Sequence, residues 1–120
     1  MTSEHLNLVK LCVGVYHIDQ LRASQAAQIS GYSEPFPRHV TRMRPRRSVE
    51  LLNGGSLYWV IKGLILCRQE IVALETVFDS IMGRRCAIIL DPNLIRTKPI
   101  RRRPFQGWRY LYADDTPPDL

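Results

Sequence analysis

The chain has 120 residues, of which 45% are hydrophobic and 23% are charged, so residues 1–120 have the composition of one folded domain rather than of a disordered chain. No apolar run approaches the roughly 18 residues of a membrane-spanning helix, and residues 1–5 lack the basic start of a secretory signal. We therefore expect a cytoplasmic protein without a membrane partner. Its formal net charge of +6 favours an anionic partner.

The first half of the chain predicts two strands and two helices. Valine and leucine dominate the first strand, whereas a modest apolar stripe of Leu21, Ala26 and Ile29 marks the main helix. Two prolines within three residues exclude a helix from the loop at 33–37. The strands are expected at 6–15 and 39–44, the main helix between an N-cap at Asp19 and a stop at Gly31, and a short helix between Pro45 and Gly55.

The second half predicts strands almost throughout. Tyr, Trp, Val and Ile stand together at 56–62, and this is the strongest strand signal in the chain. Gly63 then marks a bulge or a turn, and residues 77–82 are expected to form a short turn or helix. The remaining strands are expected at 64–76, as one bent strand or two, and at 85–90, 94–98 and 105–112.

The succession of short strands with few helices indicates an α+β fold. There is no regular alternation of strand and helix, which disfavours a doubly wound parallel sheet. We expect a mostly antiparallel sheet curled into an open barrel, with one main helix and one or two short helices.

Basic residues are concentrated in two segments. Of the seventeen basic residues fourteen are arginine, and a guanidinium binds phosphate in a bidentate manner and stacks on bases. If the fold brings the two segments together, they form one positive face that suits nucleic acid; the alternative is a solvated basic surface with some internal ion pairing. The segments hold Arg38, Arg42, Arg44, Arg46 and Arg47, and Arg84, Arg85, Arg96, Lys98, Arg101, Arg102, Arg103 and Arg109.

Aromatic residues alternate along the last predicted strand. Gln106, Trp108, Tyr110 and Tyr112 share one face, next to three consecutive arginines, which is typical of a stacking surface for single-stranded nucleic acid. Alternatively, Trp108 and Tyr110 fill the core. The candidate nucleic-acid-binding residues are Arg42, Arg44, Arg46, Arg47, Tyr58, Lys62, Arg101, Arg102, Arg103, Gln106, Trp108, Arg109 and Tyr110.

The predicted strands also place Tyr58, Trp59 and Arg68. Trp59 aligns with apolar neighbours and is expected in the core, whereas Tyr58 points to the opposite face and is better placed to line a site. Arg68 lies among apolar residues and needs a partner if it is buried, for which Glu70 on the same face is the obvious candidate.

No catalytic or metal-binding pattern stands out. Cys12, Cys67 and Cys86 are widely spaced and sit in apolar runs, as buried free thiols do. The three histidines have no metal-ligand spacing, and no phosphate-binding glycine loop or nucleophile elbow occurs. We therefore expect no metal, no cofactor and no catalytic residue, although one sequence leaves the question of an enzyme open.

Several segments are similar to those of a known family. They are Gly54–Gly63, Cys67–Gln69, Arg103–Leu111 and the ending Pro117–Leu120. With them, nearly the whole chain resembles the largely alphaproteobacterial family DUF1489, from which the region 23–37 departs by being shorter. That resemblance implies no activity. A fainter resemblance in layout, from the first strand through the Gly-Gly turn to Gly63, is to PUA-like barrels of the EVE and ASCH types, which implies binding of RNA or a modified base.

Three functional hypotheses follow. The first is a small RNA- or single-strand-binding module. The second is a protein-interaction or assembly factor whose basic face meets an acidic protein. The third is an enzyme acting on a phosphorylated small molecule, which would need a pocket that joins Lys62, Arg68 and Arg109.

Overall fold

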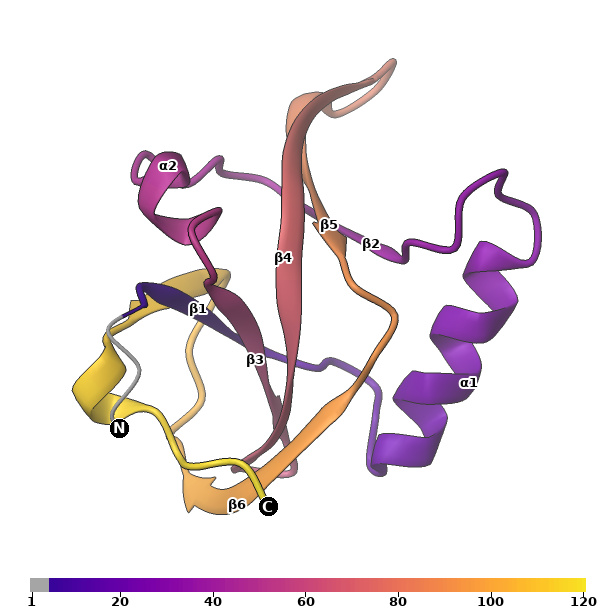
Figure 1. Cartoon of the computed structure of the whole chain (residues 1–120). Coiled ribbons are helices and arrows are strands. Elements are labelled where there is room, and N and C mark those ends of the chain that lie inside the picture. The colour runs from indigo at the N-terminus through magenta and orange to yellow at the C-terminus, as the bar shows by residue number, and fades with distance from the viewer. Residues whose placement is uncertain (1–4) are drawn as a thin grey trace.

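The computed structural model describes residues 5–120, so the start of the chain, on which the expected lack of a signal rests, lies outside the described residues. These residues form a sheet with two α-helices and one 3-10 turn (Figure 1). The strands are β1 (Asn7–Leu11), β2 (Arg38–Thr41), β3 (Ser56–Ile61), β4 (Leu64–Asp79), β5 (Gly83–Leu90), β6 (Ile95–Arg101) and β7 (Trp108–Leu111). The helices are α1 (Ile18–Ile29) and α2 (Ser48–Leu51), and the 3-10 turn is η1 (Ala113–Asp115).

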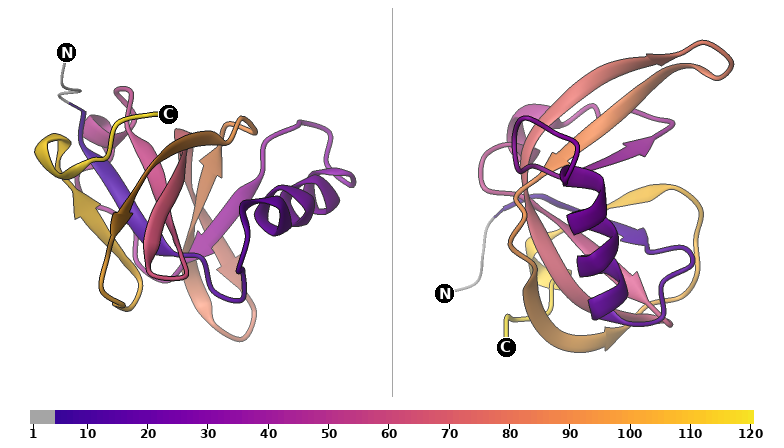
Figure 2. Two further views of the ribbon diagram at one scale, coloured as in Figure 1. Left: turned by 90° about the horizontal axis from the view of Figure 1, so that it is seen from below. Right: turned by 90° about the vertical axis from the view of Figure 1, so that its right-hand side faces the viewer.

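The strands make one mixed sheet in the order β2-β5-β4-β3-β1-β7, with β6 paired to β4. β1 and β3 run parallel, and the other pairings are antiparallel. The expected combination of a mainly antiparallel sheet with few helices is confirmed. The sheet curves strongly (Figure 2) but is not closed, because its end strands β2 and β7 do not pair with each other.

A tight turn joins β3 to β4. Lys62 and Gly63 both have positive φ, at 52° and 79°, as the two central residues of a type I′ hairpin turn require. The predicted turn at Gly63 is therefore confirmed, and Lys62 belongs to the turn rather than to the strand. The Gly63 carbonyl also accepts the Arg102 backbone N–H at 2.9 Å, which fixes the arginine-rich segment after β6 beside this turn.

The expected turn or helix at 77–82 is wrong for its first half. β4 is one strand that continues to Asp79, because Val77 and Phe78 pair with Arg85 and Arg84 of β5. The connection is restricted to 80–82, where the Asp79 carboxylate accepts two backbone N–H groups. The β4–β5 hairpin projects well beyond the rest of the sheet (Figure 1).

Both helices differ in detail from their predictions. α1 starts one residue before the expected N-cap Asp19, and its buried residues are Ile18 and Leu21, whereas Ala26 is exposed. α2 starts at Ser48 rather than at Pro45, which is buried in the segment before the helix. The predicted apolar stripe is correct for the buried Leu21 and the half-buried Ile29 but wrong for Ala26. After its first turn α1 contacts the core partly through the polar side chain of Gln25, which is also half-buried.

Two apolar clusters lie on opposite faces of the β1–β3 region. The larger contains Leu8, Trp59 and Cys67, together with residues of β5 and the first turn of α1. The smaller contains Val9, Tyr58 and neighbours from β4 and β7. The predicted core position of Trp59 is confirmed, since it is 3% exposed.

The cysteines behave as small hydrophobic residues. Cys67 and Cys86 are buried, Cys12 is half-buried, and all three are free thiols. Burial raises the pKa of Cys12 to about 11 and that of Cys67 to about 12, so both thiols stay protonated and unreactive at neutral pH.

Gln69 is the polar centre of the larger cluster. It is fully buried, and its amide oxygen accepts the indole N–H of Trp59 at 2.9 Å. Its amide group also pairs with that of Gln25 on α1 and donates to the Asp91 carbonyl at 3.0 Å. The network joins β3, β4, α1 and the turn after β5, so it positions the helix against the sheet.

His39 on β2 packs edge-on against Trp59, with 5.2 Å between the ring centroids. Burial, aided by the charge of Lys10, lowers the pKa of His39 from 6.5 to about 4. The folded state therefore prefers the neutral ring, and between these two pH values the unfolded chain binds the extra proton. The stabilisation that the neutral His39 ring contributes is fully present above pH 6.5, and it is lost as the pH falls from 6.5 to about 4.

We expect the free energy of unfolding to fall by about 3 kcal/mol from pH 7 to pH 4 through this residue alone. Urea unfolding across this range measures it. In His39→Gln the slope should be clearly shallower, whereas in His17→Gln, which alters an exposed histidine, it should be retained. Equal slopes in all three proteins would contradict the assignment.

Candidate nucleic-acid interface and adjoining groove

Side chains of β7, at one end of the strand order, contact the segment that follows β2, the strand at the other end. The indole N–H of Trp108 donates to the Met43 carbonyl at 2.7 Å, and the Tyr110 hydroxyl accepts the Arg47 backbone N–H at 3.1 Å. Met43 and Arg47 belong to the segment that follows β2. We call these two contacts the seam. The seam brings the arginine-rich segment 42–47 against β7, which follows Arg101, Arg102 and Arg103 in the chain.

The aromatic pair on β7 is part of this seam. Trp108 and Tyr110 are half-buried, pack against the larger apolar cluster and contact each other edge-on, with 5.0 Å between centroids. The predicted shared face of these two residues is thus the face toward the core. Gln106 and Tyr112 are exposed.

We expect Trp108→Ala to lower the free energy of unfolding by about 2 kcal/mol, because it removes half-buried apolar surface as well as the seam contact. Thermal or urea unfolding measures the loss. Trp108→Phe keeps a ring and should retain most of the stability. An unchanged melting curve for Trp108→Ala would show that the seam carries no stability and would favour a ring devoted to a ligand.

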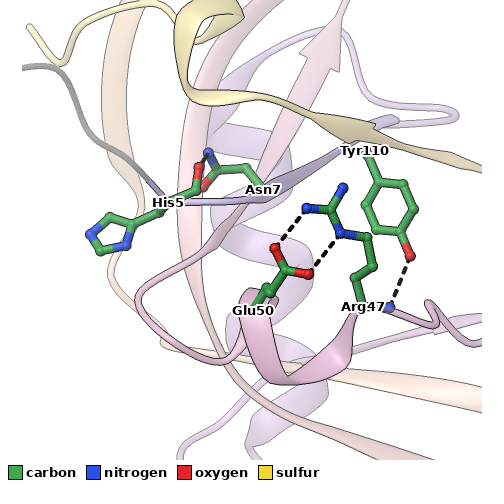
Figure 3. Close-up of polar contacts among 5 residues, drawn as sticks. All are labelled: His5, Asn7, Arg47, Glu50 and Tyr110. Atoms are coloured by element: carbon green, nitrogen blue, oxygen red, sulfur yellow. Dashed lines mark hydrogen bonds and ion pairs between the residues drawn. The ribbon is translucent and has the colours of Figure 1, made fainter.

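The Arg47 side chain already has partners within the protein (Figure 3). Its guanidinium makes two hydrogen bonds to the Glu50 carboxylate, at 2.8 and 2.6 Å, and lies over the rings of Tyr110 and Tyr112. The hydrogen bonds lower the pKa of Glu50 and raise that of Arg47. Of the predicted phosphate-binding residues, Arg47 therefore already has a carboxylate partner.

The neighbouring arginines of this segment have more freedom. Arg42 and Arg46 are exposed, and neither makes an ion pair with a carboxylate among residues 5–120. Arg44 is also exposed and donates to the Leu74 carbonyl of β4 at 3.1 Å, so its other guanidinium N–H groups remain available.

The second arginine-rich segment surrounds Phe105. The guanidinium groups of Arg102 and Arg109 lie 5.5 and 4.9 Å from the centre of that ring. Arg101 and Arg103 are exposed and, within the described residues, have no ion-pair partner. Lys62 is exposed on the adjacent β3–β4 turn.

A groove of about 700 Å³ lies between the start of β1 and the last residues of the described chain. Arg68 crosses it, with two hydrogen bonds to the Asp119 carboxylate at 2.9 and 2.8 Å and one to the Ser56 hydroxyl at 2.9 Å. The interpretation of Glu70 as the partner of Arg68 is therefore wrong, because the chain end brings Asp119 closer. The ion pair lowers the pKa of Asp119.

Tyr58 and Asn7 line the same groove. Tyr58 is 5% exposed, and burial raises its pKa. The Asn7 side chain accepts the Ser56 backbone N–H at 2.9 Å. It also donates to the His5 carbonyl at 2.9 Å (Figure 3). Sequence reasoning missed Asn7, Asp119 and His5 in this groove. Three aspartates stand near the end of the given sequence, at 114, 115 and 119, but nothing in the sequence identifies Arg68 as a partner.

The three residues required by the enzyme hypothesis do not meet in this groove. Arg68 lines it, whereas Lys62 and Arg109 are not among its lining residues. Within residues 5–120, no group of three His, Cys, Asp or Glu side chains has an arrangement that would hold a metal ion. None of the helices in the same residues is long and apolar enough to cross a membrane.

Comparison with known proteins identifies the family of the chain. No curated protein and no solved structure matches the chain. The family described as protein of unknown function DUF1489 matches residues 8–120, which is nearly the whole chain. The protein therefore belongs to the DUF1489 family.

Proposed function

We propose that this protein is a cytoplasmic module that binds RNA or another single-stranded nucleic acid. The observation that carries the proposal is the seam, in which Trp108, which follows Arg101, Arg102 and Arg103 in the chain, contacts Met43 of the segment 42–47. Arginine is the residue best suited to bidentate phosphate contacts. The phosphate contacts are assigned to exposed arginines without a carboxylate partner among residues 5–120: Arg42, Arg46, Arg101 and Arg103.

Five of the remaining predicted residues take supporting roles in this proposal. Arg44 and Arg109 keep free guanidinium N–H groups beside the same segments, and Lys62 adds a charge at the β3–β4 turn. Gln106 and the exposed edge of Trp108 offer contacts to bases. In the same proposal the curved sheet is an open barrel of the PUA-like type.

The test is a titration of a fluorescent single-stranded RNA at several salt concentrations. Four phosphate contacts give a log–log slope of binding constant against salt of about −3, at roughly −0.7 per contact. The double variant Arg101→Gln/Arg103→Gln should reduce the magnitude of this slope by about 1.4.

The matched control is Arg22→Gln, because Arg22 is exposed on α1 and paired with Asp19. It lowers the net charge without touching either segment, so both slope and affinity should stay close to those of the wild type. Absence of binding at low salt would refute the proposal, and an equal effect of Arg22→Gln would reduce it to nonspecific charge attraction.

A second candidate is a protein-interaction or assembly factor. It is favoured by the tip of the β4–β5 hairpin, where Phe78, Ile81 and Met82 are 74%, 88% and 61% exposed. Such apolar groups on a projecting hairpin are typical of contact surfaces. Loss of self-association or partner capture in Ile81→Ser, with RNA binding unchanged, would separate this role from the first.

A further inference from the structure

A lysine lies on the core side of the sheet. Lys10 of β1 is in register with Trp59 on β3 and with Trp108 on β7, and residues directly opposite one another across a sheet point to the same face. Both tryptophans contact the larger apolar cluster. Lys10 is therefore flanked by two indole rings at the edge of the core, where a cation without a partner is unusual.

Lys10 opens into a pocket of about 240 Å³ between α1 and the ends of β1, β2 and β3. Trp59 and Leu21 supply aromatic and aliphatic surface, and the imidazole of His39 lies edge-on to Trp59. The volume is below the range of drug-sized ligand sites, so an occupant is small. This pocket is separate from the groove crossed by Arg68.

The lining carries positive charge and no negative charge. Lys10 and Arg38 contribute to it, but no aspartate or glutamate does. Lys10 makes no ion pair with a carboxylate among residues 5–120. The thiol of Cys12 and the ring of His39 are both neutral at pH 7, so nothing within the pocket compensates the two cations.

His39 has a buried ring nitrogen to spare. Its Nε2 atom is shielded from solvent and has no hydrogen-bond partner within the described residues. A buried polar atom without a partner is uncommon in a folded protein and indicates a group that a ligand or a water satisfies. Because His39 also lines the pocket, an occupant can supply the missing partner.

We propose that this pocket binds a small carboxylate with a planar apolar body. The carboxylate pairs with Lys10 and accepts a hydrogen bond from neutral His39, and the planar body lies against Trp59 and Leu21. The inference is independent of the nucleic-acid proposal, since it uses none of the arginines on the two exposed segments.

The experiment follows the indole N–H signals of the two tryptophans by NMR while benzoate is added to the full-length protein. Trp108→Phe assigns the two signals. Benzoate should shift the Trp59 signal in a saturable way, with the millimolar affinity usual for a ligand of this size. Benzamide, which has the same shape without the charge, should bind roughly tenfold more weakly or worse, as expected when a charge-assisted bond is lost.

Lys10→Met is expected to weaken benzoate binding by roughly tenfold as well. Lys98→Met, which removes an exposed lysine from β6, should leave benzoate binding unchanged. The benzamide comparison uses the wild type and so holds even if a variant fails to fold. Inorganic phosphate that shifts Trp59 as strongly as benzoate would overturn the assignment of an apolar body. No shift of Trp59, or equal binding of benzamide, would overturn the site itself.

Discussion

Gly55→Ala should destabilise this protein more than other glycine-to-alanine substitutions in its turns. A Cβ atom at Gly55 would lie 2.2 Å from the Leu6 carbonyl oxygen and 2.5 Å from the Leu51 carbonyl oxygen. Both are backbone atoms, and the Gly55 N–H itself donates to the Leu51 carbonyl at 2.9 Å, so neither α2 nor the chain before β1 can move aside without losing contacts. We expect the free energy of unfolding to fall by about 3 kcal/mol or more.

Urea unfolding measures this effect, with Gly31→Ala as the matched control. Gly31 lies in the turn after α1, has no heavy atom within 4 Å of an added Cβ and does not adopt a positive φ. Its substitution should change the stability by no more than about 0.5 kcal/mol. Equal stability of the two variants would mean that the close approach of α2 to the chain before β1 is not as described.

Gln69→Leu should be comparably damaging for a different reason. The leucine fills a similar volume, but the Trp59 indole N–H and the Asp91 carbonyl lose a partner in the interior, and the Gln25 amide loses both of its bonds. Each buried group left without a partner costs about 1–3 kcal/mol. We expect a total loss of about 3 kcal/mol, because the half-buried Gln25 can turn toward water.

The double variant Gln69→Leu/Gln25→Leu sharpens this test. Removing both amides leaves fewer unsatisfied groups, so the double variant should be more stable than the sum of the two single changes predicts, which a double-mutant cycle measures. Gln106→Leu, at an exposed position, is the control and should be nearly neutral. Strict additivity of Gln25 and Gln69 would contradict the network.

Strand positions were predictable because they depend on local chemistry. The strand at 56–61 and the turn at Gly63 are determined by β-branched and aromatic residues and by a glycine that tolerates positive φ. The extension of β4 to Asp79 was not predictable in this way. It depends on pairing with the arginine-rich start of β5, which has little strand character on its own.

The contents of the sites were harder to predict than the strands. The partner of Arg68 lies at the far end of the chain, and no spacing rule relates Arg68 to Asp119. In the sequence Lys10 is a single lysine within an apolar run, yet register with Trp59 and Trp108 gives it a defined environment. Alternation along one strand predicts which of its residues share a face. Which residues of the neighbouring strands lie beside them depends on the order of the strands in the sheet.

The sheet order has a consequence for how the protein is made. β1 pairs with β3 on one side and with β7 on the other, so the first strand is completed by the last. The seam contacts likewise join residues 63 and 65 positions apart. Contacts between such distant parts of a chain slow folding. During synthesis one edge of β1 and the segment after β2 therefore remain without these partners until β7 has been made.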